Sequence, residues 1–167
     1  MRLFFFLYAV LIFAPVSYGQ EVKLEHKQAK DYYVLEGYNE FVCKDCKESK
    51  ISTEEIGIVK QIMAKAVKEY NIKAEKQYRL DVKEYPKEKI EKSNYVIDLK
   101  RYKFQIVAGI NKSKEKIVLI SCHCDESKFF DYTKQLISTQ DGGNCYFQLR
   151  INLSTKEYYD FMVNGIA

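Results

Sequence analysis

Residues 52–71 read STEEIGIVKQIMAKAVKEYN, and this stretch decides the fold class of the 167-residue chain. Ser52 and Glu55 form a capping box, in which the hydroxyl and the carboxylate each accept a hydrogen bond from an N–H at the start of the helix. Apolar residues then recur at steps of three and four, which predicts an amphipathic helix ending near Asn71. These residues are Ile56, Val59, Met63, Ala66, Val67 and Tyr70. Such a helix buries one stripe and needs a sheet to bury it against.

The rest of the chain supplies candidate strands and turns. Segments rich in β-branched and aromatic residues predict strands at 32–35, 77–83, 95–110, 116–123, 145–151 and 157–163. Polar or glycine-containing segments predict connections at 84–93, 111–115, 141–143 and 152–156. Residues 126–137 fit either a short helix or an irregular connection. One helix followed by hairpin-linked strands predicts an α+β domain, with one long helix packed on a four- to five-stranded antiparallel sheet.

The N-terminus has the pattern of a secretory signal. Arg2 precedes an apolar run at 3–13, and Ser17 and Gly19 are small residues where a signal peptidase reads. The run is shorter than the about 20 apolar residues that span a bilayer. We therefore expect a signal peptide at 1–19 cleaved after Gly19, an N-terminal arm at 20–51 and the α+β domain at 52–167. The predicted product is secreted or periplasmic and has no membrane attachment once the signal is removed.

The charge pattern does not favour nucleic-acid binding. Loss of Arg2 with the signal lowers the formal net charge from +4 to +3. The basic residues are mostly lysines that alternate with acidic residues, as on a solvated surface. Proteins that bind nucleic acids usually carry an arginine-rich face with aromatic rings placed for stacking, and no such face is evident here.

The five cysteines are expected to form structural disulfides, because export implies an oxidising compartment. They are Cys43, Cys46, Cys122, Cys124 and Cys145, and an odd number leaves one thiol over. A bond from Cys145 to Cys122 or Cys124 would join neighbouring strands. The CxxC spacing of Cys43 and Cys46 also fits a redox pair or half a zinc site. The βαβ setting of a redox pair and the paired CxxC of zinc sites are both missing, so no metal or cofactor is predicted.

Three motifs, in the right chain order, resemble secreted cystatins, the inhibitors of papain-like cysteine proteases. The helix ends in AVKEYN at 66–71, QIVAG at 105–109 matches the Q-x-V-x-G loop of the family, and CYFQL at 145–149 resembles its C-x-F-Q strand. The resemblance covers roughly residues 52–165 and implies a cystatin-like fold. A second resemblance, in DGGNCYF at 141–147 and NGIA at 164–167, is to a group of uncharacterised small exported bacterial proteins.

The cystatin resemblance implies that two hairpin loops enter a protease cleft beside the catalytic cysteine. The residues that would contact the protease are Gln105, Ile106, Val107, Ala108 and Gly109 in the first loop, and Leu153 and Ser154 in the second. The family has Pro-Trp in the second loop, and this chain contains no tryptophan. By composition, 111–115 is the better turn. If the chain reverses there, 105–109 lie inside a strand and cannot enter a cleft.

These observations predict a secreted, non-enzymatic binding protein, with inhibition of a papain-like cysteine protease as its sharpest form. The alternative is an exported interaction or structural module of the same fold with no inhibitory activity. A thiol-dependent enzyme using Cys43 and Cys46 is a third class. It is disfavoured because the chain has only two histidines, His26 and His123, and neither is placed to activate a thiol.

Overall fold

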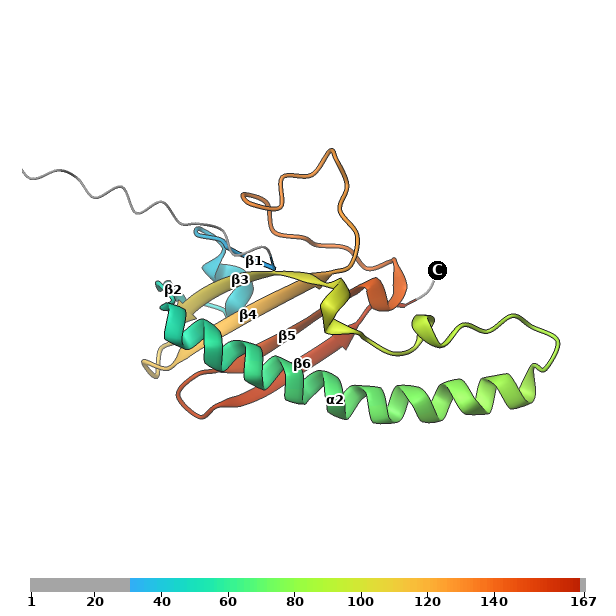
Figure 1. Cartoon of the computed structure of the whole chain (residues 1–167). Coiled ribbons are helices and arrows are strands. Elements are labelled where there is room, and N and C mark those ends of the chain that lie inside the picture. Colours follow the sequence, from blue (N-terminus) through green and yellow to red (C-terminus); the bar gives the residue numbers. More distant parts are fainter. Residues whose placement is uncertain (1–30, 166–167) are drawn as a thin grey trace, which may run out of the picture.

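The computed structural model describes residues 31–165, so the predicted signal peptide and its cleavage site lie outside the described residues. The described part is an α+β domain in which one long helix lies across a sheet (Figure 1). In chain order the elements are β1 (Tyr32–Val34), α1 (Asn39–Val42), β2 (Lys47–Glu48), α2 (Thr53–Glu84), the 3₁₀ turns η1 (Lys92–Asn94) and η2 (Leu99–Arg101), β3 (Lys103–Ile110), β4 (Lys116–His123), the 3₁₀ turn η3 (Gly143–Cys145), β5 (Tyr146–Asn152) and β6 (Glu157–Val163). Among these residues no helix is both long enough and apolar enough to cross a membrane.

The capping box at the start of α2 is formed as predicted. Ser52 Oγ accepts the N–H of Glu55 at 3.1 Å, and the Glu55 carboxylate accepts the N–H of Ser52 at 2.8 Å. The helix runs to Glu84, however, so the strand predicted at 77–83 is wrong. Residues 72–84 are mostly strong helix formers such as Lys, Glu, Gln and Leu. Tyr95 also packs against this end of the helix, where its ring meets that of Tyr78 and its hydroxyl donates to Asp81 at 2.7 Å.

The sheet is mixed, and the prediction of a purely antiparallel sheet is therefore wrong. Its strand order is β1-β3-β4-β5-β6, and β2 also pairs with β3. The strands β3 to β6 form an antiparallel series, whereas β1 runs parallel to β3. A parallel pair needs a long connection, and here the whole of α2 and the segment after it separate β1 from β3.

The main core lies between α2 and the sheet. Val59, Met63 and Val67 are buried on the helix side, as the apolar stripe predicted. Alternate residues of the three central strands meet them: Phe104, Ile106 and Ala108 of β3, Val118, Ile120 and Cys122 of β4, and Phe147, Leu149 and Ile151 of β5. The other face of the same strands is therefore turned away from α2.

That second face is covered by the chain before α2 and by a long connection. A smaller apolar cluster consists of Leu35, Val42, Cys46, Val107, Ile117 and Leu119. Residues 31–51, which we expected to form an arm, thus contribute strands and core to the domain. Residues 124–142, between β4 and η3, contain turns but no helix or strand, and they rise from this face as a projecting loop (Figure 1).

The strand predicted at 95–110 begins only at Lys103. The preceding residues form η1 and η2, where Asp98 accepts the N–H of Lys100 through its side chain at 3.2 Å. The Asn144 amide also holds this segment, because it donates to the carbonyls of Ser93 at 2.7 Å and Val96 at 3.0 Å. Side-chain hydrogen bonds to the backbone thus stabilise turns where β-forming residues favoured a strand.

Candidate functional site

The five residues of the cystatin-like motif lie inside β3. Gln105, Ile106, Val107, Ala108 and Gly109 are all buried. The chain reverses at 111–115, where Asn111 donates its N–H to the carbonyl of Glu115 at 3.0 Å. The turn prediction at 111–115 is therefore confirmed. Leu153 and Ser154 do lie in the turn between β5 and β6, half-buried and exposed respectively. The structure therefore does not bring the two predicted contact segments together at an exposed edge.

The cysteines form two disulfides and leave one thiol. Cys43 pairs with Cys46, and Cys124 pairs with Cys145, one of the two partners that the sequence left open. Cys122 is free and buried between α2 and the sheet, with its sulfur 3.8 Å from that of Met63. Burial raises the pKa of the Cys122 thiol well above its ordinary value, so it is held as an unreactive thiol.

The most distinctive feature of the second face is the 124–142 loop. The Cys124–Cys145 disulfide closes its base, and Cys124 also donates its N–H to the carbonyl of Cys145 at 3.0 Å. At the C-terminal end of the loop, Gly142 has a φ of 91°. A Cβ atom there would lie 2.6 Å from the ring of Tyr146, so both backbone conformation and space require glycine.

Gln105 holds this loop onto the sheet from below. Its side-chain nitrogen donates to the carbonyls of Tyr132 at 2.8 Å and Gln135 at 2.6 Å, and its side-chain oxygen accepts the N–H of Ile137 at 2.8 Å. Three backbone groups of an irregular segment are therefore satisfied by one fully buried amide. The residue at the start of the cystatin-like motif thus has a structural role inside the protein.

His123 lies beside Gln105 on the same face, at the end of β4. Its ring is buried and stacks on the ring of Tyr132, with centroids 4.5 Å apart and an angle of 15° between the planes. Neither ring nitrogen has a hydrogen-bond partner among the described residues. Burial is the main cause that lowers the pKa of His123 below its ordinary value, so the ring is neutral near pH 7.

Charged groups near His123 are already paired with other groups. Glu126 Oε1 lies 3.8 Å from His123 Nε2, but its carboxylate accepts from Lys103 at 2.7 Å and from the Tyr33 hydroxyl at 3.2 Å. The bond from Lys103 holds the pKa of Glu126 below its ordinary value. Similarly, Tyr146 donates to Asp125 at 2.5 Å, and this bond raises the pKa of Tyr146 to about 12.

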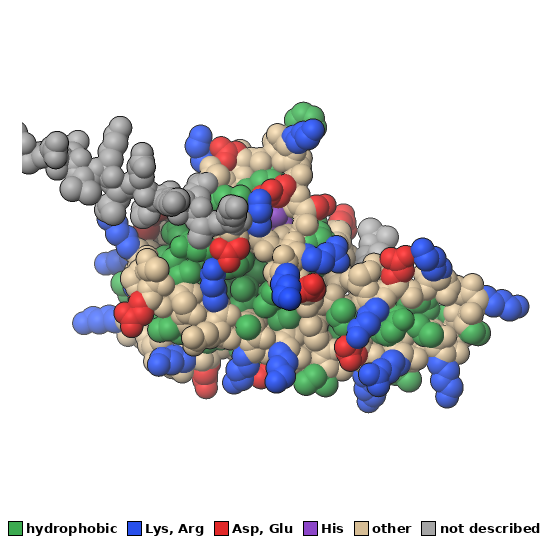
Figure 2. Space-filling view, in the orientation of Figure 1, with side chains coloured by type: hydrophobic (Ala, Val, Ile, Leu, Met, Phe, Trp, Pro, Cys, Tyr) green, Lys and Arg blue, Asp and Glu red, His purple; other side chains and the backbone are tan. Residues whose placement is uncertain are grey.

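The outer end of the loop presents a single aromatic side chain. Phe129 is fully exposed, whereas its neighbour Phe130 packs edge-on against Tyr132 with centroids 4.7 Å apart. The turn that carries Phe129 is well defined, because Ser127 accepts the N–H of Phe129 through its hydroxyl and that of Phe130 through its carbonyl. Figure 2 shows the projection, with a hydrophobic and a basic side chain at its outermost end.

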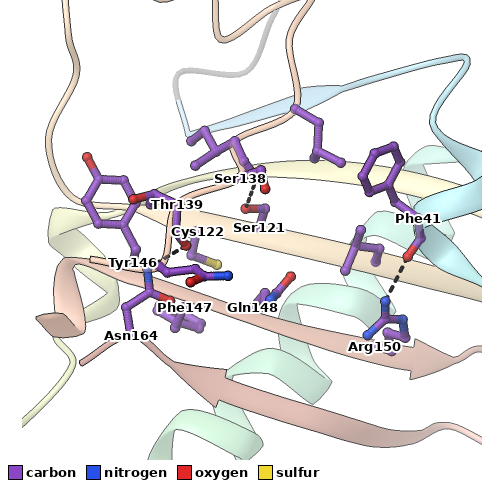
Figure 3. A pocket seen from close by; sticks show the side chains of 14 residues that line it. Phe41, Ser121, Cys122, Ser138, Thr139, Tyr146, Phe147, Gln148, Arg150 and Asn164 are labelled. Atoms are coloured by element: carbon purple, nitrogen blue, oxygen red, sulfur yellow. Dashed lines mark hydrogen bonds between the residues drawn. The ribbon is translucent and has the colours of Figure 1, made fainter. Parts of the chain in front are cut away.

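A small cavity of about 170 Å³ lies next to the loop, on the same face of the sheet (Figure 3). Loop residues 136–140 form one wall, and Ser121, Tyr146 and Gln148 contribute to the other. Arg150 also lines it, but its guanidinium donates to the carbonyls of Phe41 and Val42, at 2.8 Å each. The cavity is therefore an indentation beside the loop. Its one cationic lining residue, Arg150, already holds α1 against β5.

Residues 31–165 contain no group of three or more His, Cys, Asp or Glu side chains placed to hold a metal ion. In comparisons with known proteins, no family model, no curated protein and no solved structure matches the chain. The interpretation of the second face therefore depends on its own geometry.

The sequence allowed a short helix or an irregular connection at 126–137, and the structure has the irregular connection. It did not indicate that this segment projects from the sheet or that a polar cluster lies beneath it. One signal was present: Gln105, Ser121 and His123 are polar residues in strands that are otherwise apolar, and they share one face by the period of two. Buried polar residues on a sheet face usually need hydrogen-bond partners, and the long segment after β4 could supply them.

Proposed function

We propose that the chain is an exported, non-enzymatic binding protein that contacts a protein partner through the 124–142 loop, with Phe129 as the anchor. The observation that supports this proposal is the complete exposure of Phe129 on a turn that the rest of the loop holds in place. Full burial of such a side chain contributes about 1.5–3 kcal/mol. Aromatic residues that enter a partner's pocket often supply a large share of the binding energy.

The loop is suited to binding because little of it would need to become ordered. Its base is closed by a disulfide, its middle is bonded to Gln105, and its tip turn is bonded to Ser127. A preorganised loop loses less conformational entropy on association than a free one. A rigid projection that ends in one aromatic side chain can enter a small apolar pocket on a partner protein.

The chemistry of the tip favours a protein over a bilayer. Stable attachment to a membrane takes two signals, such as two inserted chains or one chain and a basic patch. Here Phe130 is turned inward, so only one aromatic side chain could insert. Lys128 is the basic neighbour of Phe129, whereas Lys134 is already paired with Asp131 at 3.4 Å, so the tip has no basic patch. We therefore expect a partner with an apolar pocket and an acidic group beside it to accept Lys128.

A photo-cross-linking experiment tests the proposal. Phe129→p-benzoylphenylalanine protein is mixed with the extracellular and periplasmic fractions of the cells that make the chain. We expect a discrete adduct, which an excess of unlabelled wild-type protein abolishes. Phe129→Ser protein should not compete, because it lacks the anchor while the fold beneath it is unchanged. The same photo-reactive residue at Ser154, an exposed position in the turn between β5 and β6, serves as the matched control and should give no such adduct.

Three results would overturn this proposal. They are the absence of an adduct from position 129, equal competition by wild-type and Phe129→Ser protein, and sedimentation with lipid vesicles that depends on Phe129. The last result would mean that the tip inserts into a bilayer.

A further inference from the structure

We propose that His123 and Tyr132 form an acid-sensitive latch, which keeps the 124–142 loop closed at neutral pH and releases it as the pH falls. The inference deepens the proposed function, because the same loop carries Phe129, and its biological meaning rests on that function. The opening of the loop is a property of the chain alone and can be measured without a partner.

The geometry disfavours a charged imidazole while the loop is closed. The side chain of His123 is fully buried, one face of its ring is covered by Tyr132, and neither nitrogen makes a hydrogen bond to a described residue. The carboxylate oxygen that lies nearest, Glu126 Oε1, is 3.8 Å from His123 Nε2, beyond hydrogen-bond distance. A buried ion without a hydrogen bond is more costly than a buried neutral ring. A proton added to His123 therefore favours any conformation in which the ring reaches water.

Groups that face the ring from the other elements do not remove this cost. From β3, Lys103 lies directly opposite His123 in the register, and its positive charge opposes a second one. Glu126 of the loop is bonded to Lys103 and to Tyr33 of β1, so its charge is largely compensated. Asp125 of the loop accepts from Tyr146 of β5, and the hydroxyl of Tyr132 accepts the N–H of Ser127.

The direction of the pH effect follows from these contacts. In the open loop His123 has its ordinary pKa near 6.5, whereas burial lowers the pKa of His123 in the closed loop. The open form therefore binds the proton more tightly. Closure is fully favoured above pH 6.5, and below it the ratio of open to closed forms rises by up to about tenfold per pH unit, until the lowered pKa is reached. Carboxylates, phenols and lysines titrate mainly outside the range from pH 5 to 7.5.

Amide hydrogen exchange can report the opening directly. Two loop amides are bonded within the closed structure, Ser127 N–H to the Tyr132 hydroxyl at 2.7 Å and Ile137 N–H to Gln105 at 2.8 Å. After correction for the intrinsic pH dependence of exchange, their protection should fall by up to about fivefold between pH 6.5 and 5.5. The amide of Ile120, in the centre of β4, should keep its protection over the same range.

Two variants separate the latch from other effects of acid. His123→Phe keeps an aromatic ring against Tyr132 and removes the titration, so loop protection should no longer depend on pH. His26→Ala removes the other histidine of the chain and should leave the wild-type pH dependence unchanged. If His123→Phe does not fold, NMR titration of the wild-type ring gives the answer, because a His123 pKa at or above 6.5 overturns the latch.

The outcomes also distinguish the latch from the proposed function. Loop protection that stays constant from pH 7.5 to 5 overturns the latch, whatever the cross-linking at position 129 shows. Loss of protection in wild-type but not in His123→Phe protein supports the latch, even if cross-linking does not depend on Phe129 and the proposed function fails. If both hold, the adduct from position 129 should weaken at pH 5.5 in wild-type protein and persist in His123→Phe protein.

Discussion

Gly109 lies where β3 passes close to the Cys43–Cys46 disulfide. A Cβ atom on this residue would lie 3.0 Å from Cys46 Cβ, 3.2 Å from Cys46 Sγ and 3.3 Å from the carbonyl oxygen of Lys47. Two of these atoms belong to a cross-linked side chain, and the third belongs to β2, which pairs with Gly109 through Glu48. None is the free end of a flexible side chain, so the neighbours can give way only at a cost.

We predict that Gly109→Ala lowers the free energy of unfolding by about 1–3 kcal/mol, the usual cost of overpacking a filled interior. Gly57→Ala is the matched control, because a Cβ atom on this exposed residue of α2 meets nothing within 4 Å. It should raise stability by roughly 0.5–1 kcal/mol through helix propensity. Urea denaturation followed by circular dichroism measures both. Equal stability of Gly109→Ala and wild type would contradict the close approach that the structure shows.

Gln105 shows why a short motif could not locate the candidate site. Its three hydrogen bonds go to backbone groups about 30 residues away, and these contacts exist only once the loop has folded onto the sheet. Q-x-V-x-G fixes three positions, and alternating residues in a buried strand can satisfy them as readily as an exposed loop.

The partner of Cys145, by contrast, could be narrowed from the sequence to Cys122 or Cys124, because adjacent strands place few cysteines within reach.

Among the elements, α2 was only partly predictable. Its start and its buried stripe follow from local signals, the capping box and the periodic apolar residues. Its continuation beyond Asn71 depends on a segment that returns along it. Asn71 does not end the helix: its side-chain nitrogen donates to the carbonyl of Ile97, and its side-chain oxygen accepts the N–H of Ile97, each at 2.8 Å. Asparagine thus stands in mid-helix because it satisfies both backbone groups of a buried residue.

We predict that Asn71→Ala lowers the free energy of unfolding by about 2 kcal/mol, although alanine is the better helix former. The loss arises because the buried N–H and C=O of Ile97 are left without a partner, at about 1–3 kcal/mol for each such group. Lys73→Ala, on an exposed position of the same helix, should change stability by less than about 0.5 kcal/mol. Urea denaturation curves for both variants give the comparison. If Asn71→Ala is as stable as Lys73→Ala, the two hydrogen bonds between Asn71 and Ile97 do not contribute to stability.

At the scale of the whole molecule, long-range pairing explains what sequence patterns could not reveal. The strands β4, β5 and β6 match their predicted positions because each is defined by local alternation and a following turn. The parallel pairing of β1 with β3 joins Tyr33 to Gln105, and nothing in either segment alone indicates the partner or its direction. The cover on the second face is equally non-local, since it combines α1 with the 124–142 loop.

This arrangement encloses β3 on every side. One face of β3 packs against α2, and the other lies beneath α1 and the 124–142 loop. One edge is paired with β4 along its whole length, and the opposite edge is paired with β1 and β2. A protease cleft could therefore reach residues 105–109 only if strands separated, which would cost a large part of the stability of the domain.

We accordingly predict that purified protein comprising residues 20–167, at micromolar concentration, leaves the activity of papain unchanged in a titration with a peptide substrate. A functional cystatin in the same assay is the positive control. Stoichiometric inhibition would contradict the prediction and would require contact residues other than 105–109. The turns at 111–115 and 153–156 would then be the place to look, because Leu153 donates its N–H to the carbonyl of Lys116 at 2.9 Å, which places the two turns side by side. Ser154→Glu would abolish inhibition by these turns, whereas Phe129→Ser would abolish inhibition by the 124–142 loop, so the two variants would assign the inhibitory surface.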